Sequence, residues 1–217
     1  MCGHNIIAHD LQYMNEYIAS VIPNYIAIDT LCLSPLLFPM RPYHRLVKDD
    51  KLQSDSLNNP LNDSIKAMEL FDEEVSAFRR LPINLRRIFC SHLSNTKQFY
   101  GFFHYINEEP LVDVEQAIRE YFHDKICTNV DLSLMICEVP IELAYTLALI
   151  NTNDRHSVTP AWVLRNYPRV NNVIRLLRNT PCKDGCEYCN RKLDVRAPAK
   201  QSLRMCLVRH RQRSRKN

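Results

Sequence analysis

Three cysteines late in the chain have a spacing suited to metal chemistry. The stretch "TPCKDGCEYC" places Cys182, Cys186 and Cys189 in the pattern Cys-x3-Cys-x2-Cys. Thiolates are the ligands of structural zinc sites and iron–sulfur clusters, and a Cys-x2-Cys pair is a common zinc knuckle. Gly185 stands between two of them, where a tight turn favours a residue without a side chain. The spacing therefore indicates a structural zinc site.

The cluster needs a fourth ligand, for which the sequence offers Cys206 or His210. Because a strong zinc signature has two well-spaced pairs, the alternative is a turn with unliganded thiols after the last helix. Radical-SAM enzymes hold a four-iron cluster with the same local spacing. We do not expect that chemistry here, because only 28 residues follow Cys189 and they are too few to form the enzyme's barrel.

Other catalytic signatures are absent from the sequence. The histidines form no HxxxH or HExxH pair, and there is no GxGxxG, Walker or GxSxG motif. These motifs supply the metal ligands, phosphate-binding backbone or nucleophile of common enzyme classes. We therefore predict a protein that is not an enzyme and needs no cofactor other than structural zinc.

The elements that position these cysteines are predicted to be helices. The chain has only three glycines among 217 residues, which argues against nucleotide-binding α/β folds and glycine-rich hairpins. The run "VPIELAYTLALIN" is almost entirely apolar, so it is predicted to be a central helix. Pro160 is expected to begin a short helix and Pro168 another, with Val170, Val173, Ile174 and Leu177 along one stripe.

These patterns predict an all-α fold, a helical bundle with a basic, disordered tail. Four segments are expected: an N-terminal helical segment over 1–47, a polar linker over 48–63, a helical interaction domain over 64–180, and a cysteine-containing turn with the tail over 181–217. The most apolar stretch, in the first 40 residues, is interrupted by Pro23, Asp29 and Pro35. It is predicted to be core, with no membrane partner.

Charge is unevenly distributed along the chain. Arg155 to Asn217 carry 16 basic and 3 acidic residues, a net +13, whereas Met1 to Asp154 carry a net −9. A basic tail on an acidic body is typical of nuclear import signals or of weak nucleic-acid contact, although such runs are often merely solvated. The predicted contact residues are Arg209, Arg211, Arg213, Arg215 and Lys216.

The stretch from Val112 to Asn179 resembles a helical module of transcription elongation factors. The pattern is an apolar helix ("AYTLALI"), then "SVTPAWVL", then "PRVNNVIRLLRN". It is similar to the TFIIS-type N-terminal domain and to the integrase-binding domain of the lens-epithelium-derived growth factor family. This resemblance implies a compact right-handed bundle of about four or five helices in the C-terminal half of the chain.

The resemblance also implies docking of short peptide motifs from transcription and chromatin proteins at two interhelical loops. By position these loops hold Ile126, Cys127 and Thr128, and then Asn179 and Thr180. Cys127 replaces an acidic residue and Thr180 an aromatic one that the integrase-binding form carries. Such grooves depend on a few side chains, so these departures weaken the expectation of the same partners.

Two functions are therefore predicted. The leading hypothesis is a nuclear protein–protein interaction module of a transcription- or chromatin-associated protein. The alternative is a small zinc-containing nucleic-acid-binding protein of viral or mobile-element origin. Stoichiometric zinc and salt-dependent binding would favour the alternative.

Overall fold

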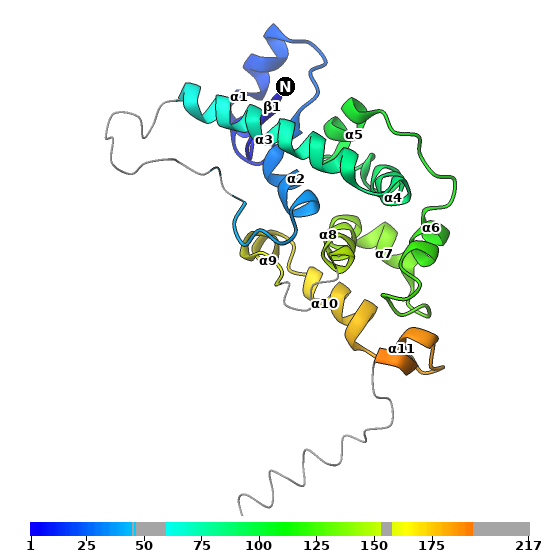
Figure 1. Cartoon of the computed structure of the whole chain (residues 1–217). Coiled ribbons are helices and arrows are strands. Elements are labelled where there is room, and N and C mark those ends of the chain that lie inside the picture. The colour runs from blue at the N-terminus through cyan, green and yellow to red at the C-terminus, as the bar shows by residue number, and fades with distance from the viewer. Residues whose placement is uncertain (45, 47–59, 153–157, 193–217) are drawn as a thin grey trace, which may run out of the picture.

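The computed structural model describes residues 1–44, 46, 60–152 and 158–192. Within them the chain forms eleven α-helices and a short π-helix, and the only strands are two of two residues each. The predicted all-α fold is thus confirmed, whereas the handedness of the bundle stays a prediction. Figure 1 shows the helices around a core, with α1 at one end and α11 at the opposite end.

The N-terminal part consists of two short strands and two helices. They are β1 (Cys2–Gly3), α1 (Asp10–Val21), β2 (Ile28–Asp29) and α2 (Thr30–Leu37). The strands pair in parallel, and the Asp29 carboxylate accepts hydrogen bonds from the backbone N–H groups of Asn5, Ile7 and Leu31. The Asp29 side chain therefore caps α2 and also hydrogen-bonds the N-terminal segment that lies beside this helix.

The middle of the chain forms α3 (Pro60–Arg80), α4 (Ile83–Leu93), α5 (Tyr100–Ile106), α6 (Val114–Tyr121) and α7 (Leu132–Glu138). Helix α3 begins inside the predicted linker, where Pro60 suits the first turn of a helix because its missing N–H has no partner there. The buried rings of Phe78, Phe102 and Phe103 pack edge to face between α3 and α5.

Helix α8 (Pro140–Asn151) lies at the centre of the core, as its apolar composition predicts. Ten of its twelve residues are buried, and it packs against α2, α4, α7 and α10. Since α2 shares this core, the N-terminal segment and the predicted interaction domain form one packing unit. Among the described residues, no single helix is long and apolar enough to span a membrane. Helices α7 and α8 reach that length and composition only when they are counted together, and the pair is bent by 120°.

The last described elements follow the predicted proline boundaries. They are α9 (Ala161–Asn166), α10 (Val170–Ile174), the π-helix η1 (Arg175–Asn179) and α11 (Glu187–Lys192). Val170, Val173 and Leu177 of the predicted stripe are buried, whereas Ile174 is half-buried. Helix α10 continues directly into η1, which brings the chain to the cysteine-rich turn (Figure 1).

Candidate metal centre

Four cysteine sulfurs meet beside the end of η1. The Sγ atoms of Cys127, Cys182, Cys186 and Cys189 all lie within 4.8 Å of one another. Cys127, Cys186 and Cys189 are buried, and Cys182 is half-buried. Three of these thiols come from the C-terminal stretch, and the fourth comes from the loop between α6 and α7.

The C-terminal stretch folds into a compact knuckle around its sulfurs. The backbone N–H of Cys186 donates to Cys182 Sγ at 3.2 Å, and that of Cys189 donates to Cys186 Sγ at 3.4 Å. Gly185 closes the turn with φ of +65°, a conformation that side-chain-bearing residues rarely adopt, and its carbonyl accepts from Asn190 Nδ2. Gly185 therefore has the role expected for a turn between ligands.

Cys127 is presented by a loop that the bundle holds on both sides. The preceding Ile126 is buried, and its N–H donates to the carbonyl of Phe122 at 3.1 Å. The N–H of Cys127 itself donates to the carbonyl of Leu177 at 2.7 Å. The loop after α6 thus lies against the end of η1, just before the chain enters the knuckle.

Helix α11 secures the knuckle against the bundle. Tyr188 is buried, and its hydroxyl donates to the carbonyl of Arg178 at 3.2 Å. Arg191 Nη2 reaches the carbonyl of Asp124 at 3.1 Å. Three groups of contacts therefore join the C-terminal stretch to η1 and to the loop after α6: the sulfurs, the tyrosine and the arginine.

The surroundings of the sulfurs favour thiolate at one position. Burial opposes ionisation of Cys186, but hydrogen bonds from the backbone N–H groups of Cys189 and Thr128 lower the pKa of this thiol to about 6. Burial raises the pKa of the Cys127 thiol. Asn129 Nδ2 donates to Cys182 Sγ at 3.5 Å. N–H groups directed at sulfur stabilise thiolates, which are the form that binds metal.

The structure brings together three of the four predicted ligands and adds one that sequence reasoning assigned elsewhere. Cys182, Cys186 and Cys189 lie together, while Cys206 and His210 fall outside the described residues. The fourth sulfur near them is that of Cys127. No local spacing signals this role, because Cys127 and Cys186 are 59 residues apart in the sequence.

The residues predicted to dock a peptide lie beside this centre. The first loop contacts the end of η1, just before the second loop, through the hydrogen bond from Cys127 to Leu177. Ile126 and Cys127 are buried, however, whereas Thr128 and Asn179 are exposed and Thr180 is half-buried. The predicted tail contacts, Arg209, Arg211, Arg213, Arg215 and Lys216, lie outside the described residues.

A second group of buried and half-buried polar side chains lies near the N-terminus. His4 Nδ1 hydrogen-bonds Thr30 Oγ1 at 2.9 Å, and His44 Nδ1 hydrogen-bonds Ser34 Oγ at 2.8 Å. Glu74 of α3 is fully buried, and neither of its carboxyl oxygens has a hydrogen-bond partner among the described residues. Burial raises the pKa of Glu74 to about 10, so it is protonated at neutral pH.

Comparisons with protein-family models, curated proteins and solved structures found no match to this chain. The four-sulfur cluster is the feature of the described residues with the most specific chemistry.

Proposed function

We propose that the chain is a zinc-stabilised helical protein that binds nucleic acid through its basic C-terminal region. The observation that carries the zinc assignment is the convergence of four cysteine sulfurs within 4.8 Å. Tetrahedral sites of four sulfurs are typical of zinc or of a single iron ion, and zinc is the usual occupant of structural sites.

The sulfur separations support one ion rather than an iron–sulfur cluster. A tetrahedral ion with metal–sulfur bonds of about 2.3 Å separates its sulfurs by about 3.8 Å. Cys127 Sγ and Cys186 Sγ lie 3.8 Å apart. A cluster of several iron atoms holds its cysteine sulfurs farther apart, because the ligands bind different metals. The separation does not fit the four-iron cluster of radical-SAM enzymes.

The ligand set favours a structural role for the ion. Catalytic zinc sites have three protein ligands and leave a position for water or substrate, whereas four protein ligands complete the tetrahedron. Zinc bound here would join the loop after α6 to the stretch between η1 and α11. We propose that it holds the C-terminal end of the fold together.

Charge supports nucleic acid as the partner. Between residues 160 and 192 the described chain has seven basic and two acidic residues, and Arg175, Lys183 and Lys192 are exposed. The sequence continues with the basic residues of the predicted tail. Clustered Lys and Arg neutralise phosphates and release counterions, which gives affinity for DNA or RNA without sequence specificity.

The loops predicted to dock a peptide have a different role in the proposed metal centre. The first loop supplies a buried sulfur to the cluster, and Ile126 is only 1% exposed, so neither side chain is available to a peptide in this conformation. We propose that these loops serve the metal centre. Peptide docking, nuclear localisation, viral or mobile-element origin and the absence of enzymatic activity stay predictions.

Metal analysis tests the zinc assignment. Protein purified under reducing conditions should contain one equivalent of zinc, and Cys189→Ser should contain much less. Cys32→Ser is the matched control, because Cys32 is also buried but lies in α2, away from the cluster. Folded wild-type protein without bound metal would contradict the proposal.

Salt-dependent binding tests the nucleic-acid assignment separately. Fluorescence anisotropy with labelled duplexes between 50 and 200 mM salt should give a steep, sequence-independent decrease in affinity, by roughly 0.9 log units per log unit of salt for each phosphate contact. Arg211, Arg213 and Arg215 changed together to Gln should reduce this slope. The control changes Arg79, Arg80 and Lys97 to Gln together, because these residues are exposed and lie elsewhere in the fold. This loss of three charges should leave the slope unchanged. Equal slopes for the two triple variants would argue against a C-terminal interface.

A further inference from the structure

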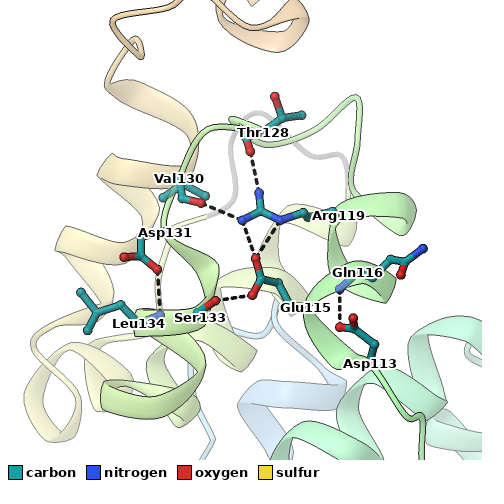
Figure 2. A network of polar contacts seen from close by, with 9 residues as sticks. All are labelled: Asp113, Glu115, Gln116, Arg119, Thr128, Val130, Asp131, Ser133 and Leu134. Atoms are coloured by element: carbon teal, nitrogen blue, oxygen red, sulfur yellow. Dashed lines mark hydrogen bonds and ion pairs between the residues drawn. The ribbon is translucent and has the colours of Figure 1, made fainter.

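One arginine of α6 holds the part of the loop that follows Cys127. Arg119 Nη1 donates to the carbonyl of Thr128 at 2.5 Å, and Nη2 donates to the carbonyl of Val130 at 3.0 Å. Figure 2 shows the guanidinium lying under the loop with both carbonyls turned toward it. The arginine therefore fixes the backbone immediately after the cysteine.

Arg119 is itself held by an anchored carboxylate. Its Nε and Nη2 donate to Glu115 Oε1 at 3.0 and 2.6 Å. The other oxygen, Glu115 Oε2, accepts from the hydroxyl of Ser133 at the start of α7 (Figure 2). The hydrogen bonds from Ser133 and Arg119 lower the pKa of Glu115, so it is ionised at neutral pH. The network joins α6, the loop and α7.

The held loop supplies one thiol to the sulfur cluster and two N–H donors to the neighbouring sulfurs. It carries Cys127, and the N–H of Thr128 and the amide of Asn129 are directed at the sulfurs of Cys186 and Cys182. The other three sulfurs belong to a knuckle that makes its own internal hydrogen bonds. The position of the loop therefore decides whether the fourth sulfur meets the other three.

We propose that Arg119 is a positioning residue of the metal centre, which holds the loop over residues 127–131 so that Cys127 completes the four-sulfur site. This inference rests on the proposed zinc site. Hydrogen-bonded groups around metal ligands commonly orient them, and their loss costs about 10- to 100-fold in metal affinity. An ordinary exposed ion pair four residues apart on a helix has no such effect.

The geometry separates this role from that of a charge alone. The guanidinium uses three nitrogens to reach two carbonyls and one carboxylate at once, which an ammonium group cannot do from one point. Arg119→Lys should therefore resemble Arg119→Met rather than the wild type. The matched control is Arg169→Met, because Arg169 also approaches a carbonyl, that of Glu138, and a carboxylate, that of Glu142, but neither belongs to the loop.

The experiment measures zinc affinity by competition with a chromogenic chelator, using full-length protein. We expect Arg119→Met to weaken zinc binding by about 10- to 100-fold and Arg169→Met to leave it within a factor of two or so. Cobalt(II) substitution supplies a spectroscopic readout, since the absorption bands of a tetrahedral tetrathiolate should lose intensity in Arg119→Met. Unchanged affinity and an unchanged cobalt spectrum would overturn the inference.

A double-mutant cycle separates positioning from general stability. In a Cys127→Ser background the loop has no sulfur to place and keeps only its N–H contacts with Cys182 and Cys186, so adding Arg119→Met should weaken zinc binding much less than it does in the wild type. A loss of equal size in both backgrounds would overturn the positioning role. If Arg119→Met does not fold, Ser133→Ala, which removes one contact of the network, is measured in both backgrounds with the same expected sign. Wild-type protein that binds no zinc would overturn both this inference and the proposed centre.

Discussion

The backbone N–H of Cys127 donates a 2.7 Å hydrogen bond to the carbonyl of Leu177, and this contact places the loop after α6 against the end of η1. It aligns two segments that are far apart in the sequence. The sulfur of Cys127 is thereby brought to the knuckle that begins five residues after Leu177.

The identity of the fourth ligand can be tested directly. Cys127→Ser should lower zinc affinity by at least about 100-fold, because structural zinc sites derive a large free energy from each thiolate. Cys206→Ser, which removes the ligand expected from spacing, should retain full zinc affinity, as should Cys137→Ser, an exposed thiol outside the cluster. The measurement is chelator competition under reducing conditions. The reverse ranking of Cys127→Ser and Cys206→Ser would reject the four-sulfur assignment.

Glu74 should make the protein less stable as the pH rises. Its folded-state pKa of about 10 lies above the ordinary value of 4.5, chiefly because of burial, so folding favours its protonated form. That contribution is present at low pH and is lost as the pH rises from 4.5 toward 10, at about 1.4 kcal/mol per unit. Glu74→Gln, which cannot ionise, should therefore be more stable than wild type by roughly 3 kcal/mol at pH 7.

Urea unfolding of Glu74→Gln and wild type at pH 5, 6, 7 and 8 measures this difference. The gap between them should widen steadily with pH. Glu73→Gln is the control, because Glu73 is exposed and pairs with Arg41 at the surface. A constant gap across the series would show that Glu74 does not titrate in this way.

His92 should make the protein less stable in acid. It is buried, and its Nε2 hydrogen-bonds the carbonyl of Pro140 at 2.8 Å. Burial lowers its pKa to about 4, from 6.5, so the neutral ring is favoured in the fold. Stability from this group is complete above pH 6.5 and is lost as the pH falls toward 4, by up to roughly 3 kcal/mol.

His92→Gln should keep a donor for Pro140 without a titrating group. Between pH 6.5 and 4 the free energy of unfolding of His92→Gln should fall less steeply than that of wild type. Between pH 7.5 and 8.5 the difference between the two free energies should stay constant. Chemical denaturation across this range provides the measurement. Parallel curves for the two proteins would contradict the assignment of acid sensitivity to His92.

Gly101 should not tolerate alanine. A methyl group there would lie 2.0 Å from the carbonyl oxygen of Ala27, a backbone atom that cannot rotate away. The added methyl group would push α5 away from the backbone that leads into β2, which should destabilise the protein by about 3 kcal/mol. Gly3→Ala is the control, since its nearest neighbour is the side chain of Ile6 at 3.1 Å. Equal melting temperatures for Gly101→Ala and wild type would contradict the close approach.

The helices around the metal centre were predictable because their signals are local. The apolar run marks α8, Pro160 marks the start of α9, and the spacing of Val170, Val173 and Leu177 marks the buried face of α10 and η1. The knuckle itself was predictable from Cys182, Cys186 and Cys189. These features involve residues that are neighbours in the sequence, so periodicity and spacing suffice to find them.

The fourth ligand was not predictable in this way. Cys127 approaches the knuckle only because α6, α7 and η1 pack together, and no spacing rule covers a separation of 59 residues. Arg119 and Glu115 form a common helical pair whose further contacts with Thr128 and Val130 depend on the path of a loop. Such tertiary relationships are set by packing, which one sequence does not reveal.

The long separation between Cys127 and Cys186 has a consequence for the unfolded chain. An ion bound to both would close a loop of 59 residues, and polymer statistics assign a cross-link of this length about 4 kcal/mol of lost chain entropy in the unfolded state. A chain that keeps its metal on unfolding would therefore refold from a restricted ensemble in which α7 to η1 are already tethered at both ends.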